Sequence, residues 1–168
     1  MLLVLGTVTK KAQVSIHISV PKQQLVVKRG RTTLQRFRIS TSKYGVGSED
    51  GSMKTPVGRF RVAEKIGAGM PTDTAFKSRE VVPLTPEMLA EDDLIMSRVL
   101  WLEGLEPENA NTFGRYIYIH GTNHEETIGE PASHGCVRMR NADVAELFDL
   151  VDVGTEVVIV PNEPTGCP

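Results

Sequence analysis

The strongest constraint on the fold is an alternation of apolar and polar residues near the start of the chain. The apolar members of this alternation are Val14, Ile16, Ile18 and Val20. A period of two is typical of a strand with one buried face. Turn-forming residues follow at Pro21 and at Arg29-Gly30, so the pattern predicts two further strands over 25–28 and 32–40. Three short strands joined by tight turns indicate an antiparallel meander.

Later segments predict more strands and only short helices. Strand patterns recur over 60–66, 95–102, 116–120 and 157–160. Thr85-Pro86 is a good start for a short helix, and Asn141 is expected to cap a second helix that runs to Val151. One apolar stripe along this second helix is formed by Val144, Leu147, Phe148 and Val151. We therefore expect a mainly β fold, a single β-sandwich or barrel domain with one or two short helices packed on it.

Composition and charge narrow the classes of partner. The 168 residues suit one domain, which we place at 13–160, followed by a tail at 161–168 that is expected to be disordered. The formal net charge of -2 and the scattered Lys and Arg residues argue against a nucleic-acid partner. The basic run Lys28-Arg29-Gly30-Arg31 is expected to form a hairpin turn. We expect a monomer that needs no cofactor.

A second pattern, later in the chain, carries the candidate chemistry. The strand-like run Tyr116-Ile-Tyr-Ile-His120-Gly-Thr122 ends on a histidine, and the segment Ser133-His-Gly-Cys136-Val-Arg138 follows it. A thiol attacks a carbonyl carbon well only as the thiolate, which an imidazole, a cation or backbone N–H groups favour. Sixteen positions separate His120 from Cys136, so a folded-back loop with turn residues at 129–132 has to bring base and thiol together.

Other roles for the same residues remain open at this point. A lone cysteine is often a small buried hydrophobe, and a lone histidine is often a satisfied polar residue. The potential zinc donors in this region are His120, His124, His134 and Cys136. Against zinc, the chain has no C-x-x-C, no H-E-x-x-H and no carboxylate at a recognised ligand spacing. We expect no metal site and a solvated His124. A disulfide between Cys136 and Cys167 would exclude a catalytic thiol.

Taken together, these residues resemble the signature of a known family. His120-Gly121-Thr122, followed by Ser133-His134-Gly135-Cys136-Val137-Arg138-Met139, resembles the motif of the L,D-transpeptidase catalytic domain, or YkuD domain, of bacterial cell-wall enzymes. The stretch Lys54-Thr55-Pro56-Val57-Gly58-Arg59-Phe60 resembles the T-P-x-G-x-F motif of that family. The resemblance covers residues 13–160, which is nearly the whole chain.

The resemblance implies a role for each matching residue. Cys136 matches the nucleophile that forms a thioester, and His120 matches the general base. Gly121 matches the residue whose carbonyl holds the imidazole in the right tautomer. The motif residues expected at the substrate are Ser133, His134, Gly135 and Arg138.

Two of these roles are more specific. The backbone amides of Gly135 and Cys136, together with that of His134, are expected to form an oxyanion hole. Arg138 is expected to fix the loop and to face a substrate carboxylate, for which its bidentate fork is suited.

The activity that the resemblance implies is peptidoglycan L,D-transpeptidation of stem peptides. Cys136 would attack diaminopimelate at position three of a tetrapeptide stem and release the terminal D-alanine, and an amine of a neighbouring stem would then complete a 3→3 cross-link. Water as the acceptor would make the same site an L,D-carboxypeptidase. A cell-wall-binding module with an inert cysteine is a further hypothesis.

The implied substrate lies in the periplasm or cell envelope. The apolar segment 1–6 is too short to span a membrane or to act as a signal peptide, and no other segment is apolar enough to span one.

Near the site, residues 52–58 are expected to form one wall of the substrate cleft. Residues 67–93, which show little regular pattern, are expected to cover part of it. Trp101 is expected to lie in the core.

Overall fold

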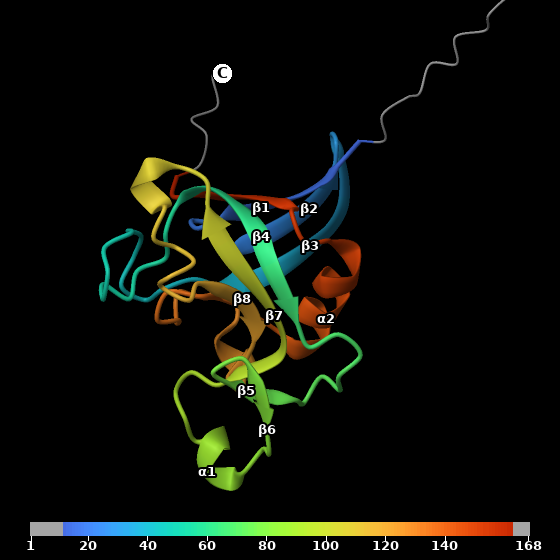
Figure 1. Ribbon diagram of the computed structural model, residues 1–168, viewed down its shortest axis with the longest axis vertical. Helices are drawn as coiled ribbons and strands as arrows, with labels where there is room; N and C mark the ends of the chain where they lie inside the picture. Colours follow the sequence, from blue (N-terminus) through green and yellow to red (C-terminus); the bar gives the residue numbers. More distant parts are fainter. Residues whose placement is uncertain (1–11, 163–168) are drawn as a thin grey trace, which may run out of the picture.

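The computed structural model describes residues 12–162, and its main feature is a closed β-barrel (Figure 1). The barrel strands are β1 (Val14–Ser19), β2 (Gln24–Arg29), β3 (Thr32–Ser40), β4 (Gly58–Ile66), β7 (Ile95–Gly104), β8 (Tyr118–Gly121), β9 (Val137–Met139) and β10 (Glu156–Val160). Around the barrel they follow the order β4-β10-β1-β2-β3-β9-β8-β7, and pairing of β7 with β4 closes the circle. The prediction of a mainly β fold is confirmed.

The first three strands form the predicted antiparallel meander. β1 pairs with β2, and β2 pairs with β3. Gly30 lies in the turn between β2 and β3 with φ of +58°, a conformation that strains residues with a side chain. Ile16 and Ile18 from the alternating segment are buried together with Leu25 and Ile39. The basic run around Gly30 is therefore a hairpin turn, as predicted.

Two strand pairings in the barrel are parallel. β10 lies parallel to β1, and β8 lies parallel to β9. A parallel pair cannot be joined by a tight hairpin and needs a longer crossover. The crossover from β8 to β9 spans residues 122–136 and includes the short 3₁₀ helix η2 (Glu125–Thr127). This crossover ends in the segment that contains Cys136.

Helix α2 (Asn141–Leu150) packs against β7 and β8. Val144, Leu147 and Phe148 are buried in the main core, so the predicted apolar stripe is confirmed. The predicted cap is wrong, because Arg140 occupies the N-cap position and Asn141 is the first helical residue. The side chain of Asn141 instead bonds both the N–H and the C=O of the residue after β8, at 3.0 and 2.9 Å.

Residues between β4 and β7 form a small lobe at one end of the barrel (Figure 1). It contains β5 (Ala75–Lys77), β6 (Glu80–Val82) and helix α1 (Pro86–Leu89), and β5 pairs with β7. Thr85 caps α1 by accepting the N–H of Met88 at 3.2 Å, as predicted. The β5–β6 hairpin was not predicted, because strands of three residues are too short to show an alternation.

Trp101 on β7 is buried, as predicted, and the 3₁₀ helix η1 (Pro107–Asn109) follows the strand.

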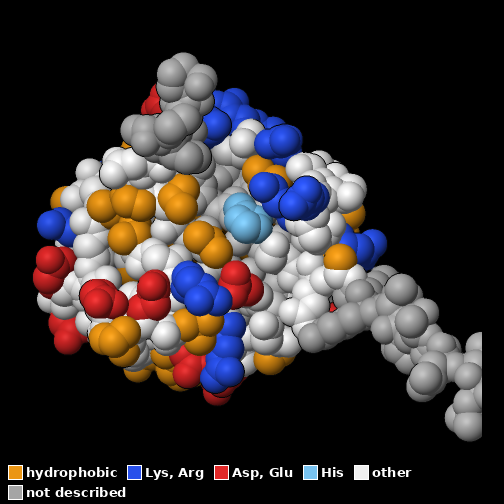
Figure 2. Space-filling view, turned by 90° about the horizontal axis from the view of Figure 1, so that it is seen from above, with side chains coloured by type: hydrophobic (Ala, Val, Ile, Leu, Met, Phe, Trp, Pro, Cys, Tyr) orange, Lys and Arg blue, Asp and Glu red, His pale blue; other side chains and the backbone are white. Residues whose placement is uncertain are grey.

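On the face seen in Figure 2, acidic, hydrophobic and neutral side chains separate the basic ones into several groups. Within residues 12–162 no helix is long and apolar enough to cross a membrane. The expectations for segment 1–6, for Cys167 and for the tail beyond position 162 concern residues outside the described range.

The contribution of α2 to stability can be tested by shortening one side chain. Leu147→Ala removes a fully buried side chain from the main core and is expected to lower the free energy of unfolding by about 2–5 kcal/mol. Val153→Ala is the control, because Val153 is 61% exposed and its truncation is expected to change stability by less than about 0.5 kcal/mol. Urea unfolding measures both values. A loss below about 1 kcal/mol for Leu147→Ala would contradict the packing described here.

Candidate active site

Strand pairing brings the end of β8 next to the start of β9. β8 is a central strand, antiparallel to β7 and parallel to β9, and all four of its residues are buried. In the parallel register His120 lies opposite Arg138. Cys136 directly precedes β9, and its Sγ accepts a hydrogen bond from the N–H of Tyr118 at 3.3 Å. The fold therefore sets the thiol beside the strand that carries the histidine.

The His120 imidazole is fully buried and held at one nitrogen. Its Nδ1 lies 2.5 Å from the carbonyl oxygen of Gly121. Because a carbonyl only accepts hydrogen bonds, Nδ1 carries the proton and Nε2 is left as the acceptor. Nε2 is buried and has no hydrogen-bond partner among the described residues. Desolvation lowers the pKa of His120, so the ring is neutral and able to accept a proton.

Gly121 has no room for a side chain. A Cβ at this position would overlap the Oδ1 of Asn141 and the backbone carbonyl of Met96. The absence of a side chain allows the first residue of α2 to bond the backbone just after β8. These bonds hold the backbone of Thr122, next to the Gly121 carbonyl that orients His120.

Cys136 is a partly exposed free thiol. Its Sγ donates to the carbonyl of Tyr116 at 3.4 Å and accepts from the N–H of Tyr118. Desolvation raises the pKa of the Cys136 thiol to about 12, although the N–H of Tyr118 and nearby arginines favour the thiolate. The resting pair is thus a neutral thiol and a neutral imidazole.

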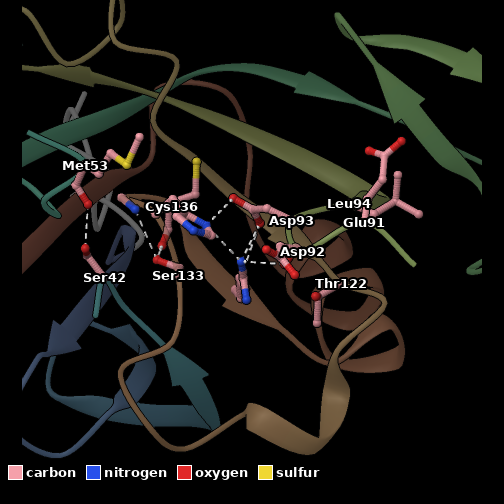
Figure 3. Close-up of polar contacts among 12 residues, drawn as sticks. Ser42, Met53, Glu91, Asp92, Asp93, Leu94, Thr122, Ser133 and Cys136 are labelled. Carbon is pink, nitrogen blue, oxygen red and sulfur yellow. Dashed lines mark hydrogen bonds and ion pairs between the residues drawn. The ribbon is translucent and has the colours of Figure 1, made fainter. Parts of the chain in front are cut away.

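Hydroxyl groups bond to the backbone of the loop that ends at Cys136. The buried Ser133 donates its Oγ–H to the carbonyl of Cys136 at 2.5 Å and accepts the N–H of Gly135 at 3.3 Å. In Figure 3 the sulfur of Cys136 points away from Ser133. Thr55 donates to the carbonyl of Gly135 at 2.9 Å and accepts the N–H of Ser42 at 3.0 Å. Thr55 belongs to the T-P-x-G-x-F motif, and sequence reasoning missed this direct tie to the cysteine loop.

The Arg138 side chain is buried and forms an ion pair, and it lines neither of the two cavities at Cys136 that are described below. Its Nε donates to Asp93 at 2.9 Å, and an NH2 group of the same side chain donates to the backbone carbonyl of Asp92 at 3.1 Å (Figure 3). The other carboxylate oxygen of Asp93 lies 3.4 Å from Nδ1 of His134. Arg138 is only 2% exposed, so the fork that was expected to reach a substrate carboxylate is already occupied.

Asp93 was not singled out from the sequence. It lies at the end of the weakly patterned segment 67–93, and only the folded chain brings it to Arg138 on β9. This pairing fastens the lobe to β9, the strand that directly follows the cysteine loop. Part of segment 67–93 therefore lies at the site, where a partial cover was expected.

Two cavities meet at Cys136. One of about 430 Å³ is lined by His120, Asp93, Arg79 and Tyr118 together with Cys136 and Tyr116. The other, of about 520 Å³, has Met53, Arg115 and His134 in its wall and again contains Cys136 and Tyr116. The thiol is therefore accessible from two sides. Met53 lies within the predicted wall segment 52–58.

One further cavity and His124, a potential metal ligand, lie apart from this pair of cavities. A larger cavity of about 650 Å³ is lined by Arg29, Arg61 and Asp152 among others, and it contains neither the thiol nor His120. His124 contacts Glu126 at 3.1 Å and the carbonyl of Glu91 at 2.9 Å, so it is partly held and not simply solvated. Within residues 12–162, no three His, Cys, Asp or Glu side chains converge as metal ligands.

A family model described as the L,D-transpeptidase catalytic domain, YkuD, matches residues 13–159. The chain belongs to this family. A stretch of 51 residues is 53% identical to the Escherichia coli protein named "Probable L,D-transpeptidase YbiS", covering 30% of this chain and 16% of that protein. The matched stretches cover less than half the length of such curated relatives, 41% of the Bacillus subtilis protein named "Putative L,D-transpeptidase YqjB" and 16% of YbiS.

Solved structures of L,D-transpeptidases share the fold. An L,D-transpeptidase from Xylanimonas cellulosilytica superposes with a TM-score of 0.59 at 21% identity, over 90% of this chain and 62% of that one. L,D-transpeptidase 3 from Mycobacterium tuberculosis, solved in complex with a faropenem-derived adduct, gives a TM-score of 0.55 at 17% identity over 88% and 60% of the two chains.

The ion pair beneath the site gives a testable prediction. Asp93→Ala leaves the buried Arg138 guanidinium without its carboxylate, which is expected to cost on the order of 2 kcal/mol of stability, since Asp93 itself is partly exposed. Asp92→Ala is the matched control, because Arg138 uses only the backbone carbonyl of that residue. Urea unfolding compares the variants. Equal stability of the two variants would contradict a structural role for the ion pair.

Proposed function

We propose that this chain is the catalytic domain of a peptidoglycan L,D-transpeptidase, with Cys136 as the nucleophile and His120 as the general base. The observation that carries the proposal is the buried, unpartnered Nε2 of His120 at a cavity that it shares with the Cys136 thiol. A buried acceptor without a partner costs free energy, and a role in proton transfer accounts for it. Membership of the L,D-transpeptidase family supports the same chemistry.

The first half-reaction forms a thioester. Sγ of Cys136 bonds to the carbonyl carbon of diaminopimelate at position three of a tetrapeptide stem, while Nε2 of His120 accepts the thiol proton. The bond from this carbon to the nitrogen of the terminal D-alanine then breaks. The imidazolium returns its proton to that nitrogen, and D-alanine leaves.

The second half-reaction transfers the acyl group. An amine of a neighbouring stem attacks the thioester carbonyl, and Nε2 of His120 accepts a proton from the attacking nitrogen. The carbon–sulfur bond breaks, and the imidazolium protonates the departing thiolate. The products are a 3→3 cross-link and the free thiol of Cys136.

The resting protonation states favour attack coupled to proton transfer over a stored ion pair. Desolvation raises the pKa of Cys136 and lowers the pKa of His120, so both groups are neutral at pH 7. The carbonyl of Gly121 accepts from Nδ1 and would stabilise the imidazolium as it forms. Backbone amides of His134, Gly135 and Cys136 are our candidates for binding the developing oxyanion.

The two cavities favour an acceptor larger than water. Because Cys136 borders both, a donor stem can occupy one while a second stem approaches from the other. Hydrolysis by an L,D-carboxypeptidase would need only one of them. A peptidoglycan substrate also implies action in the cell envelope, such as the periplasm.

Purified protein and a stem tetrapeptide test this proposal. Mass spectrometry is expected to detect D-alanine release, an acyl-enzyme and a cross-linked dimer, and Cys136→Ala is expected to abolish all three. His120→Ala is expected to slow acylation by about 10²–10⁴-fold, because the thiol loses its proton acceptor. His124→Ala serves as a histidine control outside the cavities and should keep its activity. Faropenem supplies a second acylating probe.

Each alternative function has its own outcome in this experiment. D-alanine release with hydrolysed stem and no dimer would identify a carboxypeptidase. Binding to peptidoglycan without any acyl-enzyme would identify a wall-binding module. A near wild-type acylation rate in His120→Ala would reject His120 as the base.

The neutral resting pair predicts two different pH dependences. Alkylation of Cys136 by iodoacetamide needs the thiolate, so its rate should rise about tenfold per pH unit until the pKa of about 12 is approached. Acylation by the stem needs neutral His120, whose pKa is lowered from 6.5, so activity should be lost only on going to pH values below 6.5. Mass spectrometry of samples quenched at a series of times measures both rates. An alkylation profile that levels off near pH 7 would instead indicate a resting thiolate.

A further inference from the structure

Arg79 and Arg115 line the two cavities, and Arg138 lies nearby without lining either. Of these three arginines, Arg138 and Arg115 are engaged by other groups. Arg138 is buried against Asp93. Arg115 donates to the backbone carbonyl of Lys54 at 2.8 Å and makes longer contacts, each of 3.4 Å, with the carbonyl of Gly47 and the hydroxyl of Ser52. Neither guanidinium is free to bind a ligand.

Arg79 is different, because the only carboxylate that acts on its charge, Glu64, lies beyond ion-pair distance among the described residues. Its guanidinium lies 4.9 Å from the centre of the Trp101 ring and 5.2 Å from that of Tyr116. Its hydrogen bond is a long one of 3.4 Å to the hydroxyl of Tyr118. Within residues 12–162, no carboxylate lies within ion-pair distance of Arg79. The side chain lines the cavity that contains Cys136 and the His120 ring.

The aromatic rings under Arg79 are held by contacts with one another and by a hydrogen bond. Trp101 stacks on Phe113 with ring centres 3.9 Å apart and an angle of 6° between the planes, and its Nε1 donates to the carbonyl of Phe113 at 3.1 Å. Tyr118 packs edge-on against the same indole. A guanidinium that lies over the face of an aromatic ring keeps its N–H groups in its own plane, directed away from the ring. There they can bind a carboxylate in bidentate fashion.

The turn that presents Arg79 is unfavourable for its sequence. Ser78 and Arg79 form the two-residue connection of the β5–β6 hairpin, and both have positive φ, of 50° and 66°. Such turns strongly prefer Asn and Gly. Residues held in this region of φ cluster at binding sites, where the surrounding structure maintains them. The strained conformation places a cation in the cavity, which a Gly at position 79 could not do.

We propose that Arg79 binds the carboxylate of the terminal D-alanine, the leaving group of the first half-reaction. This inference rests on the proposed transpeptidase function. In a tetrapeptide stem the carbon of that carboxylate lies within about 4 Å of the carbonyl carbon that Cys136 attacks. A cavity of about 430 Å³ that contains both the thiol and Arg79 can hold these two groups together. The D-centre carboxylate on the diaminopimelate side chain is further along the chain from the reacting carbon.

Three tetrapeptides and four proteins test the proposal. The peptides are the free acid, the peptide that ends in D-alaninamide, and the peptide amidated at the diaminopimelate side-chain carboxylate. For wild type, kcat/KM for release of the last residue is expected to fall about tenfold or more when the terminal carboxylate is amidated. In Arg79→Gln the ratio of kcat/KM for the free acid to kcat/KM for the terminal amide is expected to approach one. The change from wild type should appear mainly in the KM for the free acid. Arg79→Lys should keep part of the preference, because it retains the charge but loses the planar fork.

Lys77→Gln is the matched control. It removes one positive charge from the same hairpin, and Lys77 is exposed and does not line the cavity. The variant should keep the full preference for the free acid. If Lys77→Gln lost the preference as Arg79→Gln does, a general electrostatic effect of the hairpin would replace the specific contact.

The remaining outcomes separate this inference from the function itself. An Arg79→Gln enzyme that discriminates as wild type does would overturn the inference and leave the transpeptidase function standing. A preference that depends on Arg79 but responds only to amidation of the diaminopimelate side chain would overturn the assignment to D-alanine. Failure of wild type to release D-alanine from any peptide would reject the proposed function, and this inference with it. Thermal unfolding of each variant checks folding, and Arg79→Lys provides the test if Arg79→Gln does not fold.

Discussion

The parallel pairing of β8 with β9 is the constraint on which the candidate site depends. It sets His120 opposite Arg138 and holds Cys136, two residues earlier, beside the N–H of Tyr118. A parallel pair requires a long crossover, and this crossover supplies the hydroxyl of Ser133 beneath the cysteine. β7 on the other side of β8 and the closure of the barrel through β4 keep both strands in register. Site geometry is therefore a property of the barrel and not of the loop alone.

The charges near the candidate site leave both Cys136 and His120 neutral. The ion pair between the buried Arg138 and the partly exposed Asp93 lies next to the cysteine loop, and its two charges act on Cys136 in opposite directions. Desolvation then dominates, raising the pKa of Cys136 and lowering that of His120. Since Asp93 comes from the segment between β6 and β7, the lobe completes the electrostatic environment of a thiol that belongs to the barrel.

The parts of this structure that sequence could predict are those with local signals. Alternation located the meander, and the apolar stripe located α2, because one buried face imposes a fixed period. Motif residues indicated His120, Gly121 and Cys136. Asp93 and Thr55 carry no local sign of their contacts, because these depend on pairing between strands far apart in the chain. Asn141 misled the prediction because the same amide that can cap a helix can also bind a neighbouring strand end.

Backbone strain is concentrated where the cavities are. Of the six described non-glycine residues with positive φ, four line the two cavities at Cys136, namely Met53, Ser78, Arg79 and Tyr116. All four lie in loops or turns outside the barrel strands, whereas His120 lies within one. Strained turns persist only where surrounding packing maintains them. At Arg79 and Tyr116 the Trp101 ring supplies contacts of this kind. In the proposed mechanism, acid–base chemistry therefore lies on the barrel, and the contact proposed to select the substrate lies on a strained turn. On this proposal, changes in that turn would alter substrate preference without moving the thiol or the imidazole.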